Sequence, residues 1–284
     1  MPSNQSPQIL GTAPIGKLLV EYSLPAIIAM TVVSLYNVID SIFIGHGVGA
    51  MAIAGLAITF PLMNLIIAFC TLVGVGSATI SSIFMGQKDV QRATLVLHNA
   101  TILLLVNGIL VTIVTLIFLD PILLFFGASH ETLPYARDFM QVILIANPIA
   151  YLFVGLNNLM RATGYPRKAM LSSFLTVAVN VVVAPIFIFL LGWGIRGAAL
   201  ATAIAQLTGL VWVLAHFLNK NNYISFKRGY FRLHRRIIAS ILGIGMSPFL
   251  MNACSCIVVI IINTSLRNYG GDMAIGAYGI VNRM

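Results

Sequence analysis

Long apolar stretches separated by short polar segments follow one another along almost the whole chain. A helix needs about 20 predominantly apolar residues to cross a bilayer, and each of the first seven stretches reaches that length. The pattern predicts an all-α polytopic membrane protein with seven complete spans and an eighth that opens near residue 273. The expected spans are 18–45, 53–85, 94–126, 134–160, 169–192, 197–218 and 237–266.

The composition excludes a soluble protein. Hydrophobic residues make up 59% of the 284 residues and charged residues only 8%, whereas a soluble domain carries about 25% charged residues. Soluble enzymes and nucleic-acid-binding proteins are therefore excluded. Cys70, Cys254 and Cys256 are an odd number of cysteines in apolar stretches, so they form no disulfide framework. Residues 1–16 lack the features of a cleavable signal peptide.

The net charge of +9 follows from 16 basic against 7 acidic residues, and the basic residues gather in alternate loops. Cytoplasmic loops carry the excess of Lys and Arg in membrane proteins. The N-terminus is therefore expected in the cytoplasm, with Arg137, Arg196 and Arg267 on the opposite side. The residues expected on the cytoplasmic side are Lys17, Lys88, Arg92, Arg161, Arg167, Lys168, Lys220, Lys227, Arg228, Arg232, Arg235 and Arg236.

Two segments resemble one another at an offset of 222 residues. Residues 51–58 (MAIAGLAI) align with 273–280 (MAIGAYGI), and Pro25 and Pro248 each lie near the start of the preceding apolar stretch. Six spans separate the copies, so the copies have the same orientation, as in transporters built from parallel repeats. We expect residues 1–222 to form a first six-helix lobe, and residues 223–284 to hold a cytoplasmic linker and the truncated beginning of a second lobe.

Two complete copies of the repeat would make a 12-helix protein of about 445 residues. On this interpretation the chain holds the first six-helix lobe and about one and a half further helices. Because a cleft between two lobes needs both walls, we do not expect this portion to transport alone.

Asp40 is the acidic residue that lies well inside an expected span. A carboxylate costs at least about 2.5 kcal/mol on insertion unless it faces a polar cavity, so an intramembrane acid marks a candidate functional site. Burial disfavours the charged form of a carboxyl, as proton coupling requires. Tyr36 and Asn37 precede Asp40 on roughly the same helix face. In a second interpretation, Asp40, near Gly45 at the end of the stretch, reaches the outer interface.

Pro25, about four turns before Asp40, removes a backbone hydrogen bond and predicts a hinge in the first helix. A helix that bends and a carboxylate that changes charge are together the parts of a gate. Other polar residues in the spans are individually more typical of interhelical hydrogen bonds than of ligand contacts. They are Asn64, Asn107, Asn147, Asn157, Asn158, Asn180, Thr202 and Gln206.

The sequence contains no pattern that predicts an enzyme, a metal site or a cofactor. The five histidines form no paired metal-ligand motif, and no P-loop glycine motif of an ATP-driven pump occurs. An intramembrane transferase would need a paired acid–base or metal constellation at one membrane face. A non-transporting receptor or scaffold remains open as an alternative.

Several motifs, in order along nearly the whole chain, resemble the multidrug and toxic compound extrusion (MATE) transporters. They are residues 37–45 (NVIDSIFIG) after Pro25, 85–89 (MGQKD) followed by Arg92 and Ala93, 160–170 (MRATGYPRKAM), 192–199 (GWGIRGAA) and 269–279 (YGGDMAIGAYG). The resemblance implies twelve helices in two lobes around a central cleft. It also implies a monomer that exports organic cations or other amphipathic compounds from the cytoplasm across a bacterial inner membrane.

The resemblance also implies the coupling site. The first-helix acid, here Asp40, would be the coupling carboxylate for protons or sodium, with Tyr36, Asn37, Asn180, Thr202 and Asn157 as its polar neighbours. No other cofactor is implied.

One departure concerns the ion. Many members carry an Asp four residues after the fifth-helix Asn, whereas this chain has Ala184 after Asn180. Sodium prefers several hard oxygen ligands, so this loss weakens the sodium assignment more than the proton assignment.

A related fold serves as a flippase for lipid-linked saccharides, which is the second candidate function. A basic cavity lining would favour it, and we expect no intramembrane Lys or Arg in spans one to seven, since Arg137 lies at the start of the fourth.

Overall fold

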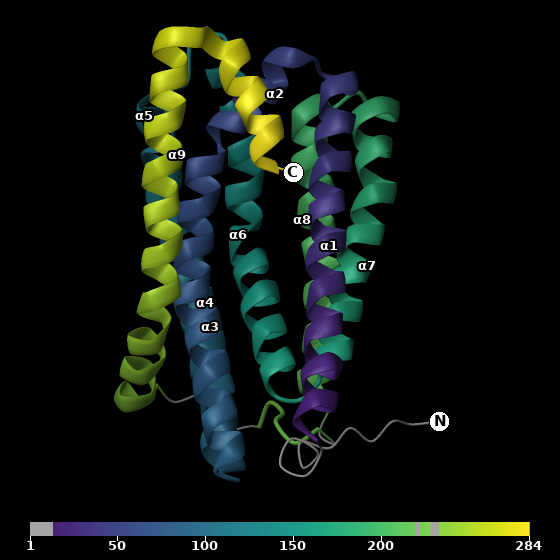
Figure 1. Cartoon of the computed structure of the whole chain (residues 1–284), viewed down its shortest axis with the longest axis vertical. Coiled ribbons are helices and arrows are strands. Elements are labelled where there is room, and N and C mark those ends of the chain that lie inside the picture. The colour runs from purple at the N-terminus through teal and green to yellow at the C-terminus, as the bar shows by residue number, and fades with distance from the viewer. Residues whose placement is uncertain (1–13, 220–221, 228–232, 284) are drawn as a thin grey trace.

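The computed structural model describes residues 14–219, 222–227 and 233–283, apart from the side chains of some residues in the first and last helices. The helices in chain order are α1 (Ile15–Gly47), α2 (Ala50–Ile58), α3 (Phe60–Gly86), α4 (Val90–Ile117), α5 (Leu119–Phe125), α6 (Leu133–Ala162), α7 (Pro166–Pro185), the π-helix η2 (Ile186–Leu190), α8 (Gly194–Leu218) and α9 (Arg235–Arg283). The long helices lie side by side along the long axis of the molecule (Figure 1).

The described part of the chain contains six helical segments that are long and apolar enough to cross a membrane. They are Met51–Gly86, Val90–Ile117, Leu133–Ala162, Pro166–Leu190, Gly194–Leu218 and Arg235–Leu266. Each coincides with a span expected from the sequence, and the remaining expected span, 18–45, lies within the 33-residue helix α1. The expected all-α multi-pass architecture is therefore confirmed.

Three expected spans are interrupted. The second consists of α2 and α3, which meet at Thr59 just before Pro61. The third ends in the separate short helix α5, which contains Pro121. The fifth changes to a π-helix after Pro185, and Leu191 N–H there donates to the Ile186 carbonyl at 3.0 Å. A proline lacks the N–H of a regular helix, so these positions favour a change of helix.

The internal repeat reappears in the backbone. The α1–α2 connection turns at Gly49, with φ 108° and ψ 178°, and α9 changes direction at Gly271, with φ 67° and ψ −171°. These positions are 222 residues apart, and both use a positive φ that glycine adopts at low cost. The domain boundary expected at residue 222 lies between α8 and α9 and stays a prediction.

The two copies of the repeat touch at equivalent positions. A Cβ atom built on Gly276 would lie 3.6 Å from the Cβ of Ala54, and Gly279 meets Ala57 in the same way one turn later. Figure 1 shows α2 and the last part of α9 at the end of the molecule opposite the N-terminus. Contacts between equivalent residues are what a two-fold relationship produces near its axis.

The connection between α8 and α9 is fixed to α4. The backbone N–H of Lys227 donates to Nε2 of the buried His98 at 3.1 Å, and the N–H of His234 donates to Oδ1 of Asn99 at 2.9 Å. The ring of Phe226 packs edge-on against His98, with the ring centroids 5.4 Å apart. These contacts fix the described ends of the connection between α8 and α9 on helix α4.

Candidate functional site

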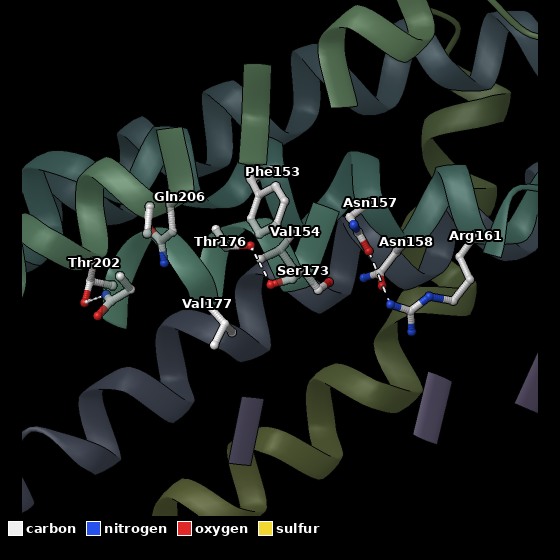
Figure 2. A pocket seen from close by; sticks show the side chains of 12 residues that line it. Phe153, Val154, Asn157, Asn158, Arg161, Ser173, Thr176, Val177, Thr202 and Gln206 are labelled. Carbon is white, nitrogen blue, oxygen red and sulfur yellow. Dashed lines mark hydrogen bonds between the residues drawn. The ribbon is translucent and has the colours of Figure 1, made fainter. Parts of the chain in front are cut away.

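A cavity of about 290 Å³ lies between α6, α7 and α8. Two-thirds of its lining residues are polar, although the surrounding helices are strongly apolar. Its lining residues are Phe153, Val154, Asn157, Asn158, Arg161, Ser173, Thr176, Val177, Asn180, Thr202, Ala205 and Gln206. Figure 2 shows these side chains in a row along the helices, with Thr202 at one end and Arg161 at the other.

Helical periodicity brings these side chains to one face. Asn157 and Arg161 are four residues apart on α6, Ser173 and Asn180 seven apart on α7, and Thr202 and Gln206 four apart on α8. Residues at such spacings lie on the same side of a helix. The polar groups therefore follow the helix axes, over about 10 Å on α7 and about 6 Å on each of α6 and α8 at 1.5 Å per residue.

One end of the cavity is held by a hydrogen bond between α7 and α8. Asn180 Nδ2 donates to Oγ1 of Thr202 at 3.1 Å, and the Thr202 hydroxyl donates to the Ala198 carbonyl at the same distance. Asn180 is almost completely buried. The pair therefore fixes both side chains at this end of the cavity.

At the other end, Asn157 connects α6 to the first turn of α7. Its Nδ2 atom donates to Ser172 Oγ and to the Ala169 carbonyl at 3.1 Å. Its Oδ1 atom accepts a hydrogen bond from an Arg161 guanidinium nitrogen at 3.3 Å. The buried amide is thus bonded on both sides and orients the arginine.

The expectation for Arg161 was wrong. The sequence placed it in the loop after the fourth expected span, but α6 continues to Ala162 and Arg161 lines the cavity. Tyr165 and Pro166 follow four and five residues later, so the polar loop is shorter than the sequence indicated. The basic residue thus belongs to the cavity wall.

Asp40 is buried in α1, with 7% of its surface exposed, and does not line this cavity. Helix α1 packs against α7 and touches η2, where the Phe43 and Phe189 rings meet edge-on at 6.3 Å between centroids. A Cβ atom on Gly47 would meet Ile188. This register places Asp40, about 10 Å further down α1, near the level of Asn180 in α7.

Three of the remaining predicted site residues lie in the cavity, and three do not line it or lie outside the described side chains. Asn157, Asn180 and Thr202 come together in the cavity wall. The side chains of Tyr36 and Asn37 lie outside the described residues. Pro25 is buried within the continuous helix α1. The roles assigned to all of them stay predictions.

Ala184 is completely buried one turn beyond Asn180, in the apolar cluster that also contains Ile44 of α1. The position that carries an acid in many similar sequences is therefore part of the packing between helices here. No group of three or more His, Cys, Asp or Glu residues that could hold a metal ion occurs among the described residues.

Sequence reasoning missed the grouping of Asn158, Arg161, Ser173, Thr176 and Gln206. Asn158 and Gln206 had been interpreted as interhelical contacts, yet neither side chain is hydrogen-bonded to another described residue, and both line the cavity. The usable signal was the spacing of three or four residues between polar positions on three separate apolar stretches.

The fold and cavity define a multi-pass helical membrane protein with a row of polar side chains in the wall of a cavity between three of its helices. The MatE family model matches residues 25–186, and the chain belongs to this family of transporters.

Relatives at the sequence level are multidrug export proteins named MepA. The protein from Staphylococcus haemolyticus (strain JCSC1435) is 31% identical over 268 residues, which cover 94% of this chain and 59% of the relative. The protein from Staphylococcus aureus (strain NCTC 8325 / PS 47) is 28% identical over 272 residues, covering 96% and 60%. The chain thus spans about three-fifths of the length of these relatives.

Solved structures of MATE transporters have the same fold. The multidrug transporter DinF-BH, in a structure with a bound dye, superimposes with a TM-score of 0.92 at 33% identity, over 99% of this chain and 63% of that chain. An inward-facing multidrug resistance transporter of the family gives a TM-score of 0.83 at 28% identity, over 88% and 57%. The arrangement of the helices in this chain is therefore that of the family.

Proposed function

We propose that this chain forms the first lobe and the start of the second lobe of a secondary antiporter that exports organic cations or other amphipathic drugs. The entry of protons or sodium would drive export, with Asp40 as the coupling carboxylate. The observation that carries the proposal is the polar cavity of Asn157, Asn180 and Thr202 beside the helix that holds the buried Asp40. The multidrug export function of the MepA relatives supports the same substrate class.

Coupling requires that the ion and the drug stabilise different arrangements of the lobes, because a ligand with equal affinity for two states shifts neither. A charged Asp40 attracts a cationic drug to the first lobe, and a neutral Asp40 releases it. Binding of the ion from outside thus favours outward release, and rocking of the lobes returns the empty site to the cytoplasm. The N-terminus lies in the cytoplasm in this scheme, and the complete protein acts as a monomer in the plasma membrane.

A proton is the better candidate for the coupling ion. Sodium prefers several oxygen ligands, and Ala184 supplies none at the position one turn after Asn180. A proton needs only the Asp40 carboxylate. The amide of Asn180 and the hydroxyl of Thr202 would then serve to hold a polar environment at the same level of the bilayer.

The test is ethidium accumulation in efflux-deficient bacteria that express the complete gene. Wild type is expected to lower accumulation, and Asp40→Asn to return it to the value of cells without the transporter. The matched control is Glu131→Gln, which neutralises an exposed loop acid and should export normally. Collapsing the pH and sodium gradients separately identifies the ion, and equal export by wild type and Asp40→Asn would contradict the coupling role.

A lipid-linked saccharide flippase is the second candidate, and the basic residue Arg161 in the cavity wall favours it. Such a protein would bind the phosphates of a lipid carrier instead of an organic cation. Failure of the wild type to export any tested cation, together with translocation of a fluorescent lipid-linked saccharide in proteoliposomes, would replace the antiporter proposal by this one.

A further inference from the structure

Arg161 is a half-buried cation at one end of a chamber that is otherwise lined by neutral groups. It belongs to the penultimate residue of α6 and lies at the end of the row opposite Thr202 (Figure 2). A charged group in such a place loses part of its hydration, and the loss is offset only when a partner of opposite charge or several hydrogen bonds replace the water.

No carboxylate partner for Arg161 occurs among the described residues. Other arginines pair with acids, namely Arg92 with Asp89 at 3.2 Å, Arg137 with Asp120 at 3.3 Å and Arg196 with Asp138 at 2.7 Å. Arg161 has instead one hydrogen bond, to the neutral Oδ1 of Asn157 at 3.3 Å. Its charge is thus not balanced by the part of the chain that the structure describes.

The unused donors of this end of the cavity suit an oxyanion. A guanidinium carries five N–H groups in a planar fork that matches a carboxylate or phosphate, and the bond to Asn157 uses one of them. Asn158, the next residue on α6, also lines the cavity and makes no hydrogen bond to another described residue. Gly74 lies beside its Nδ2 atom and leaves room for it.

The two ends of the cavity differ in charge character. The neutral side chains of Thr202 and Asn180 form one end, and the cation Arg161 forms the other. Along α7, Ser173 and Asn180 are about 10 Å apart at 1.5 Å per residue, and Arg161 lies beyond Ser173 at the end of the row (Figure 2). A substrate with both an anionic and a cationic group would place the anionic group at Arg161 and the cationic group away from it, because like charges repel.

We propose that Arg161, assisted by Asn158, is an anion subsite that recognises the carboxylate of zwitterionic amphipathic substrates. The inference rests on the proposed export function and deepens it, because it names the feature that separates zwitterionic from purely cationic substrates. Asn157 positions the guanidinium through the bond to its Oδ1 atom and through its own bonds to α7.

The test uses two dyes that differ at one group. Rhodamine 6G is an ethyl ester and a cation, and rhodamine 19 is the corresponding free acid and a zwitterion at neutral pH. Binding of each dye is measured by fluorescence anisotropy with the protein expressed from its complete gene and purified in maltoside detergent. Arg161→Gln is expected to weaken rhodamine 19 binding about tenfold, since it removes a charge-assisted hydrogen bond, and to change rhodamine 6G binding less than twofold.

Two further variants make the result specific. Arg161→Lys keeps the charge but loses the planar fork, so an intermediate loss for rhodamine 19 is expected. Arg167→Gln removes a charge from an exposed residue six positions away that does not line the cavity, and it should leave both dyes unaffected. Melting temperatures of all variants show whether the fold is retained.

Equal weakening of both dyes by Arg161→Gln would overturn the proposal, because the residue would then only support the cavity wall. A loss of rhodamine 19 affinity in Arg167→Gln as large as that in Arg161→Gln would overturn it as well, because the dye would then be attracted by a basic surface in general. If wild type binds rhodamine 6G but shows no measurable binding of rhodamine 19, the anion subsite is contradicted and the drug-binding function is not. If wild type binds neither dye, the drug-binding function itself is contradicted. The rhodamine 19 titration is then repeated in the presence of an anionic phospholipid, to see whether the lipid headgroup competes with the dye for Arg161. Competition that disappears in Arg161→Gln supports the anion subsite.

Discussion

Ala54 and Gly276 occupy the same position in the two copies of the repeat and face each other where α2 meets the last part of α9. The side chain of Ala54 is completely buried, and a Cβ atom on Gly276 would lie 3.6 Å from its Cβ. Movement of one lobe against the other would have to separate or rotate this pair, so it reports on the relative position of the two copies.

The pair can be tested with a disulfide. A Cβ separation of 3.6 Å lies within the range of about 3.5–4.5 Å that disulfides require. We expect Ala54→Cys with Gly276→Cys to cross-link under mild oxidation in a background where the native cysteines are replaced by serine. Ala54→Cys with Ala277→Cys, whose second site is exposed, should cross-link far less. If the contact opens during transport, the cross-link will abolish export until it is reduced, and export by the cross-linked protein would contradict an opening there.

Helices α3 and α9 cross closely enough that glycine is required. A Cβ atom on Gly245 would meet the carbonyl of Leu72, whereas one on Gly243, two residues earlier on the same helix, meets nothing within 4 Å. Gly245→Ala should therefore lower the melting temperature, because overpacking costs about 1–3 kcal/mol. Gly243→Ala should keep or raise it, since alanine is favoured over glycine in helices by up to about 1 kcal/mol. Equal effects of the two changes would contradict the close crossing.

The linker should be held by His98. Replacing His98 by Ala removes the acceptor of the Lys227 N–H and a ring contact with Phe226. The loss of about 1.4 kcal/mol from a buried hydrogen bond raises local opening about tenfold. We expect faster tryptic cleavage after Lys227, measured by mass spectrometry of the purified protein. The exposed His130→Ala is the matched control, and unchanged cleavage in His98→Ala would contradict the anchoring.

The Asn180–Thr202 pair should couple α7 to α8. Thr202→Val keeps the shape of the side chain and removes the oxygen that accepts from Asn180 at 3.1 Å. Interhelical hydrogen bonds of this kind contribute about 0.6 kcal/mol on average in membranes, so a modest loss of stability is expected. A double-mutant cycle with Asn180→Leu in a thermal unfolding assay should show positive coupling between the two sites, and additive effects would indicate that the bond contributes nothing.

Hydrophobic length alone was sufficient to predict the spans, because crossing a bilayer sets both the length and the apolarity of a helix. The repeat was also visible, since 51–58 and 273–280 share their small-residue pattern. The sequence did not show that Gly49 and Gly271 turn in the same way, because a positive φ leaves no signal beyond glycine itself.

The candidate site was predicted less completely. Asn157, Asn180 and Thr202 were selected by resemblance, and the structure brings them into one cavity. Arg161 was misplaced because loop and helix cannot be distinguished near a polar boundary, where helices commonly extend by a turn. Asn158 and Gln206 were set aside because a single polar residue in a span does not reveal its partners, which depend on how three helices rotate against one another.

The close crossing of α3 and α9 also bears on the order of assembly. A chain leaves the ribosome from its N-terminus, so α3 is in place before α9 is synthesised. The carbonyl surface around Leu72 and Gly76 is then already formed when Gly245 arrives, and the His98 contact holds the preceding linker nearby. We therefore expect the first lobe to offer a formed surface on which the beginning of the next one packs during membrane insertion.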